Sequence, residues 1–96
     1  MAYRVELSQH AFASLQNIDR YLRERSPGGA DNVRREIQYT LSLLADFPML
    51  GTRLPIEGVR YTVTKKYRYR IVFRPVDGVV QILKVDHPRQ QTEELL

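Results

Sequence analysis

The 96-residue chain contains no cysteine and only two histidines, His10 and His87. Without cysteine there is neither a disulfide framework nor a thiolate metal site, and two separate histidines do not make a spaced set of metal ligands. No apolar run approaches the roughly 20 residues that span a bilayer, and the first residues, MAYRVELS, contain no apolar signal region. We therefore expect one domain over residues 1–96, cytoplasmic, with no metal, no cofactor and no membrane partner.

Positive charge is unevenly distributed along the chain. The stretch Gly58–Gln90 holds eight basic and two acidic residues, a net charge of +6, whereas the first 57 residues hold seven of each. The tail adds two glutamates, so the whole chain carries +4. A basic segment behind a neutral front half indicates an anionic partner.

The spacing of apolar residues predicts a strand and then a helix at the N-terminus. Tyr3–Leu7 alternates between apolar and charged residues, which is typical of a strand. From Ala11 the apolar positions recur every three or four residues, which predicts a helix that ends near Arg25. The Ser8 hydroxyl is placed to cap that helix.

A second helix follows a short breaker, Ser26–Gly29. Ser26 can cap this helix, and Pro27 suits the first helical position because its missing N–H is not needed there. The apolar residues then step by three and four from Ala30, and the pattern ends at Phe47, which precedes a proline. Two helices joined by so short a loop predict an antiparallel helical hairpin.

The second half of the chain predicts an ordered connector and three strands. The connector Pro48–Gly58 is expected to be held on the core by its apolar side chains, Met49, Leu50, Leu54 and Ile56. Strands are predicted over Val59–Thr64, Tyr69–Pro75 and Val79–Val85. Asp77-Gly78 predicts a two-residue type I′ turn between the last two.

These elements define an α+β fold. An N-terminal strand and an antiparallel helical hairpin precede three strands, and the hairpin packs on a mainly antiparallel four-stranded sheet. The strand Val79–Val85 is apolar on both faces, so we place it in the interior of the sheet.

The predicted strand Tyr69–Pro75 and the residue before it carry the most notable group of charged side chains. Arg68, Arg70 and Arg74 lie on one face if the strand is regular, and Arg60 on the neighbouring strand can join them. Arginine binds carboxylate and phosphate equally well, so this face suits nucleic acid or an acidic protein segment. The alternative is a solvated outer face with no partner.

His87, just after the last strand, is the second candidate. It suits a general acid or base, or it is a loop histidine that makes one hydrogen bond. Tyr21, Tyr61 and Tyr69 fit core positions better than base-stacking positions. No phosphate loop, catalytic triad or paired-carboxylate pattern is present.

Five motifs are distributed over nearly the whole chain. They are Tyr3–Ser8, Pro48-x-x-Gly51, Gly58-Val59-Arg60, Tyr69–Arg74 and Val80-x-Ile82-Leu83-x-Val85-x-His87-x-Arg89. Together they resemble the RelE/ParE superfamily of bacterial toxins, and their order and spacing carry the resemblance more than any single motif does.

The resemblance implies a compact toxin that is paired with an antitoxin, whose acidic C-terminal segment wraps around it. It also implies a helical hairpin against an antiparallel sheet, as the residue pattern predicts. Two activities occur in the superfamily. RelE-like members cleave messenger RNA on the ribosome, whereas ParE-like members inhibit DNA gyrase and lack the catalytic groups.

Compared residue by residue, the sequence matches the RelE-like branch only in part. Arg70 matches the arginine that those nucleases place on the phosphate. Their paired lysines are absent from Arg60–Thr64, Pro88 stands where a basic residue is expected, and the tail has no tyrosine. The His87-x-Arg89 ending resembles the ParE-like branch.

We therefore expect a ParE-like toxin that inhibits DNA gyrase and is neutralised by its antitoxin. A ribosome-dependent mRNA endoribonuclease is the alternative, and a non-toxic binding module of the same fold is the second. Arg70, His87 and Arg89 are the catalytic candidates for the nuclease. The expected residues for binding the target or antitoxin are Arg60, Arg68, Arg70, Arg74, His87 and Arg89.

Overall fold

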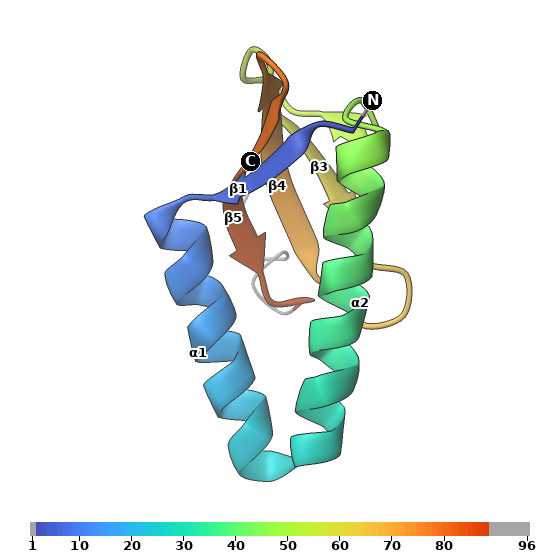
Figure 1. Ribbon diagram of the computed structural model, residues 1–96. Helices are drawn as coiled ribbons and strands as arrows, with labels where there is room; N and C mark the ends of the chain where they lie inside the picture. Colours follow the sequence, from blue (N-terminus) through green and yellow to red (C-terminus); the bar gives the residue numbers. More distant parts are fainter. Residues whose placement is uncertain (1, 89–96) are drawn as a thin grey trace.

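Two long helices lie on one side of a five-stranded sheet in the computed structural model, which describes residues 2–88 (Figure 1). The sheet order is β1-β5-β4-β3-β2; β1 is parallel to β5, and the other neighbours are antiparallel. The predicted α+β fold, a helical hairpin on a mainly antiparallel sheet, is confirmed. The elements are β1 (Arg4–Leu7), α1 (Gln9–Arg25), α2 (Pro27–Asp46), β2 (Thr52–Arg53), β3 (Arg60–Val63), β4 (Arg70–Val76) and β5 (Val79–Asp86).

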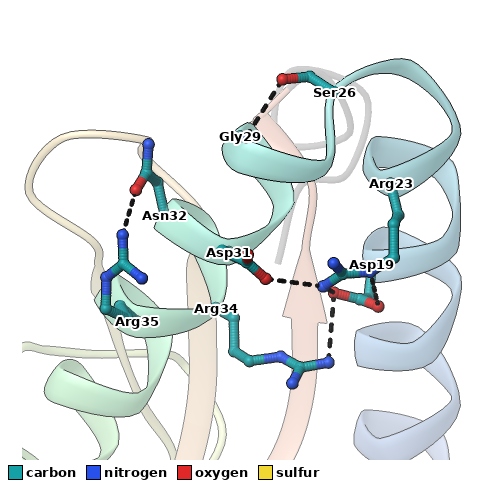
Figure 2. Close-up of polar contacts among 8 residues, drawn as sticks. All are labelled: Asp19, Arg23, Ser26, Gly29, Asp31, Asn32, Arg34 and Arg35. Carbon is teal, nitrogen blue, oxygen red and sulfur yellow. Dashed lines mark hydrogen bonds and ion pairs between the residues drawn. The ribbon is translucent and has the colours of Figure 1, made fainter.

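Both predicted helix caps are present. The Ser8 hydroxyl accepts a hydrogen bond from the Ala11 N–H at 3.0 Å. Ser26 ends α1 and caps α2, since its hydroxyl accepts from the Gly29 N–H at 3.1 Å (Figure 2). Pro27 occupies the first position of α2, so this helix begins three residues before Ala30. One serine therefore serves both helices, which keeps the hairpin turn tight.

The core lies between the helices and the sheet. Ile71 and Phe73 of β4 are fully buried there, and α2 contributes Leu44. β5 is an interior strand, as predicted. Its register shifts opposite Val72 and Phe73, so that Leu83 pairs with neither. This bulge shifts the alternation by one residue, so that Val85 joins Val80 and Ile82 on the core side. The core residues of β5 are Val80, Ile82 and Val85.

The sheet has five strands where four were predicted. The additional strand, β2, has only two residues and pairs antiparallel with β3, with Thr52 opposite Tyr61. Gly51 precedes it with φ +91°, and a Cβ there would lie 2.2 Å from the Tyr61 carbonyl oxygen. Only glycine allows the backbone to approach β3 so closely at this position.

The connector is ordered, but Met49 and Ile56 do not anchor it to the core. Met49 is 61% exposed and Ile56 is 51% exposed, so the predicted anchoring of the connector by these residues is wrong. Polar contacts with the backbone hold it instead. The Leu54 N–H donates to the Val59 carbonyl at 2.9 Å, and the Arg60 guanidinium donates to the Met49 carbonyl at 2.9 Å.

The β4–β5 turn and Tyr69 follow the prediction, whereas two other tyrosines do not. Asp77 and Gly78 have φ of 50° and 78°, as a type I′ turn requires. Tyr69 is buried in the core. Tyr61 lies opposite Val72, on the sheet face that is turned away from the helices, and Tyr21 is 49% exposed. The core positions predicted for Tyr61 and Tyr21 are therefore wrong.

Candidate functional site

We call the sheet face turned away from the helices the outer face, and Arg70 is its central cation. Arg70 lies opposite Asp86 of β5. Its Nε and Nη2 atoms donate to one carboxylate oxygen of Asp86, at 3.1 and 2.5 Å. Both residues are buried, with exposed fractions of 7% and 4%. The pair therefore joins β4 to β5 as a buried, charge-assisted cross-strand contact.

Other groups surround this pair on the outer face. The Lys84 ammonium lies 3.8 Å from the Asp86 carboxylate, and the Arg70 guanidinium lies 6.0 Å from the centroid of the Tyr61 ring. Asp86 thus balances charge from two cations, which lowers the positive potential of the outer face. Sequence reasoning did not assign Asp86 to the site; the signal for it was its cross-strand position opposite an arginine.

The predicted arginine face is divided among three places. Arg74 lies opposite Gln81 and is exposed on the outer face, as predicted. Arg68 does not belong to β4, because it lies in the turn before it with φ +63°. Arg60 lies opposite Phe73 and therefore on the helix side, with its guanidinium on connector carbonyls. The prediction that Arg60 and Arg68 share one strand face with Arg70 is wrong.

His87 lies on the other side of the sheet from Arg70. Its ring meets Tyr69 edge to face, with centroids 5.4 Å apart and planes at 84°. Both residues line a cleft of about 540 Å³ between α1 and the end of β5, which we call the His87 cleft. Burial, and then the nearby Tyr21, raise the pKa of Tyr69. No carboxylate or guanidinium of residues 2–88 lines this cleft, and its other members are Ser14, Asn17, Ile18, Tyr21 and Val85.

A larger depression, the hairpin groove, runs between α1 and α2, with a volume of about 800 Å³. Phe12, at 53% exposure, and Leu7, at 38%, lie at its edge. Sequence reasoning missed this groove, because it assigned the whole apolar stripe of each helix to the sheet. The signal for it was the width of the stripe on α1. Its floor is formed by Leu15, Ile18, Leu22, Val33, Ile37 and Leu41.

An ion network crosses from one helix to the other at the rim of this groove (Figure 2). Arg23 binds Asp19 at 2.9 Å on its own helix and Asp31 of α2 at 3.1 Å. Arg34 of α2 lies 3.5 Å from Asp19. The hydrogen bond from Arg23, and then the charges of Arg23 and Arg34, hold the pKa of Asp19 below its usual value against the effect of desolvation. The network gives an apolar groove a charged rim.

The part of the chain that the structure describes contains neither a group of metal ligands nor a membrane-spanning helix. Residues 2–88 contain no group of three or more metal-ligating side chains. None of their helices is both long and apolar enough to cross a membrane. Arg89, the last predicted site residue, lies outside the described residues.

Comparison with known proteins identifies the family. The sequence model of the "ParE toxin of type II toxin-antitoxin system, parDE" matches residues 5–92. The chain therefore belongs to the ParE toxin family, within the RelE/ParE superfamily that its motifs resemble, and it is a toxin of a type II toxin–antitoxin system. No curated protein sequence matches it.

Solved structures agree in fold. The chromosomal ParDE system of P. aeruginosa has a chain with TM-score 0.78 and 20% identity, over 90% of this chain and 96% of that one. The E. coli toxin RelE, a free double-arginine mutant, gives 0.71 and 17%, over 96% and 90%. The E. coli RelBE toxin–antitoxin complex gives 0.68 and 17%, over 90% and 96%. At these identities the likeness supports the fold alone.

Proposed function

We propose that this toxin acts in the ParE manner, by binding DNA gyrase and blocking its cycle through protein contact. The family match supports this proposal, because the matched family is that of the ParE toxin. Since gyrase works on bacterial DNA, the proposal also places the protein in the bacterial cytoplasm.

The observation that carries the choice is the position of Arg70 and His87. RNA cleavage needs a base for the 2′-hydroxyl, an acid for the leaving oxygen and a cation on the phosphate, all around one bond. Here the Arg70 guanidinium binds the buried Asp86 carboxylate on the outer face. His87 lies in a cleft on the helix side. The two catalytic candidates that the structure describes do not converge on one point.

The antitoxin is the second partner in this proposal. The hairpin groove has an apolar floor and a rim of charged groups, a shape that receives the apolar stripe of an amphipathic helix. We propose that a helical part of the antitoxin occupies it and that an acidic part meets the basic half of the chain. The family match supports an antitoxin partner, because the matched family is the toxin of a toxin–antitoxin system.

A supercoiling assay tests the gyrase proposal. Purified toxin at micromolar concentration is expected to stop gyrase from supercoiling relaxed plasmid. The antitoxin for this assay is the product of the neighbouring reading frame. Addition of an equimolar amount of this purified antitoxin is expected to restore supercoiling by gyrase. Full supercoiling at every toxin concentration would contradict the proposal, provided that expression of the same toxin arrests growth.

The alternative, a ribosome-dependent endoribonuclease, draws its support from His87 and its cleft beside Tyr69. It predicts codon-specific cleavage of messenger RNA in a translation extract, lost in Arg70→Ala and His87→Ala. Intact message with the wild-type toxin would exclude this activity. Normal growth after induction without antitoxin would instead favour the non-toxic binding module.

A further inference from the structure

Three hydrogen bonds fix the backbone of the turn between β3 and β4. We call residues Thr64–Tyr69 the basic turn. The Thr64 N–H donates to the Tyr69 carbonyl at 2.8 Å, and the Tyr69 N–H donates to the Thr64 hydroxyl at 2.9 Å. The Arg68 N–H donates to the Thr64 carbonyl at 3.2 Å, with Arg68 in the left-handed region at φ +63°. Such a conformation in a non-glycine residue has to be maintained by its surroundings.

A carboxylate from α2 provides part of that support. The two oxygens of Glu36 accept the backbone N–H groups of Lys66, at 2.6 Å, and of Tyr67, at 3.0 Å. Thirty residues separate Glu36 from Lys66 in the chain. Burial alone would raise the pKa of Glu36. The hydrogen bonds from Tyr67, Lys66 and the Thr64 hydroxyl outweigh it, so this pKa lies below its usual value. The ionised carboxylate therefore fixes the turn to the helix.

The basic turn groups three exposed cations within four residues. Lys65, Lys66 and Arg68 are all exposed. By contrast, Arg70 is buried against Asp86, and Arg60 donates to the Met49 carbonyl. Among residues 58–88, the exposed positive charge is therefore concentrated at the basic turn, with Arg74 on the outer face as a further exposed cation.

We propose that the basic turn is a preorganised binding element for an acidic polypeptide segment, and that Glu36 is its positioning residue. This inference rests on the proposed function, because the segment belongs to the antitoxin. A rigid turn loses little conformational entropy on binding, so its cations bind more strongly than the same cations on a mobile loop. Glu36 repels an anionic partner by charge, yet it strengthens binding through the turn geometry.

The surroundings of the turn favour polypeptide over nucleic acid. Tyr67 is partly buried against the core, and the Lys66 ammonium lies 5.3 Å from its ring centroid, so this ring is a poor platform for a base. Tyr61 and Val63 lie on the adjoining outer face and are only partly buried. Apolar groups beside cations match a segment in which acidic and apolar residues alternate.

Charge and geometry make opposite predictions for one substitution, which gives the test. Glu36→Gln raises the net charge by one and replaces one acceptor oxygen by an amide that cannot accept. If the geometry of the turn matters, the full-length toxin should bind its antitoxin about three- to tenfold more weakly. Glu57→Gln is the matched control. Glu57 is exposed, and its substitution makes the same change of charge outside the turn. It should bind equally or more tightly.

Lys65→Ser with Lys66→Ser provides a second, surface variant that is expected to fold normally. It should lower antitoxin affinity about tenfold at low salt, with a smaller loss at high salt. Arg74→Ser, an exposed outer-face cation, should have a smaller effect. Titration calorimetry with the purified antitoxin measures all four variants, and thermal unfolding checks that each is folded.

Two results would overturn this inference alone. One is wild-type affinity in both Glu36→Gln and the double lysine variant. The other is that the double lysine variant loses affinity for a 12-base-pair DNA duplex, relative to the wild type, while its affinity for the antitoxin is unchanged. Failure of the wild-type toxin to bind any antitoxin would overturn the proposed function itself, and the inference with it, so the two failures are distinguishable.

Discussion

The outer face of β4 and the basic turn carry the same kind of charge within a few residues of each other, in opposite environments. Arg70 is 7% exposed and bound to Asp86, whereas Lys65 and Lys66 are exposed on a turn held by Glu36. One cation stabilises the sheet, and the others are presented to a partner. A count of basic residues in the sequence does not separate these roles; the position of each carboxylate does.

Removal of the Arg70 side chain should have the largest effect on stability. Arg70→Ala leaves the Asp86 carboxylate buried without its main partner, which should lower the free energy of unfolding by about 3–5 kcal/mol. Urea denaturation followed by circular dichroism measures it. A loss below about 1 kcal/mol would show that the pair is not a structural contact of the sheet.

Replacement of both partners should have a much smaller effect. Arg70→Met with Asp86→Leu removes the charges and the desolvation that they require, so the stability should return to within about 1 kcal/mol of the wild type. Lys84, which lies 3.8 Å from Asp86 and is partly exposed, can then be hydrated. A double variant as unstable as Arg70→Ala would mean that the sheet needs Arg70 for something other than Asp86.

Glu36→Gln should cause an intermediate loss of stability that depends on pH. Losing one of the two hydrogen bonds, and the charge on the acceptor of the other, should lower the unfolding free energy by about 1–2 kcal/mol at pH 7. Because the folded pKa of Glu36 lies below its usual 4.5, its contribution is present above that value and is lost as pH falls through the folded pKa. The wild-type and variant curves should therefore converge on acidification. Parallel curves would argue against the ionised clamp.

The double lysine variant should have the smallest effect on stability. Lys65→Ser with Lys66→Ser changes exposed side chains only, so the unfolding free energy should stay within about 0.5 kcal/mol of the wild type. The same variant should lose about tenfold in antitoxin affinity, as argued above. A variant that is clearly unstable would mean that these lysines support the fold, and the contrast with Arg70 would disappear.

The sequence predicted the elements whose signals are local. The serine caps, the hairpin and the Asp77-Gly78 turn follow from neighbouring residues, and each is present. The interior position of β5 followed from its two apolar faces. Such signals need no knowledge of distant parts of the chain.

The candidate site was harder to predict, because strand parity and long-range contacts decide it. Arg68 adopts a left-handed conformation, so the alternation that joined it to Arg70 does not begin there. Arg60 alternates correctly but faces the helix side. The contact of Glu36 with Lys66 spans 30 residues and leaves no local pattern. The sequence shows how many charges the basic segment carries, but it did not predict correctly which arginines share one face of the sheet.

The most direct test measures gyrase inhibition and mRNA cleavage side by side, for the wild type and for Arg70→Met with Asp86→Leu. This double variant removes the Arg70 cation while keeping the sheet. The predicted result is that both proteins stop supercoiling at similar concentrations and leave ribosome-bound message intact. Cleavage of message by the wild type, lost in the double variant, would contradict the account, because Arg70 would then be a catalytic cation.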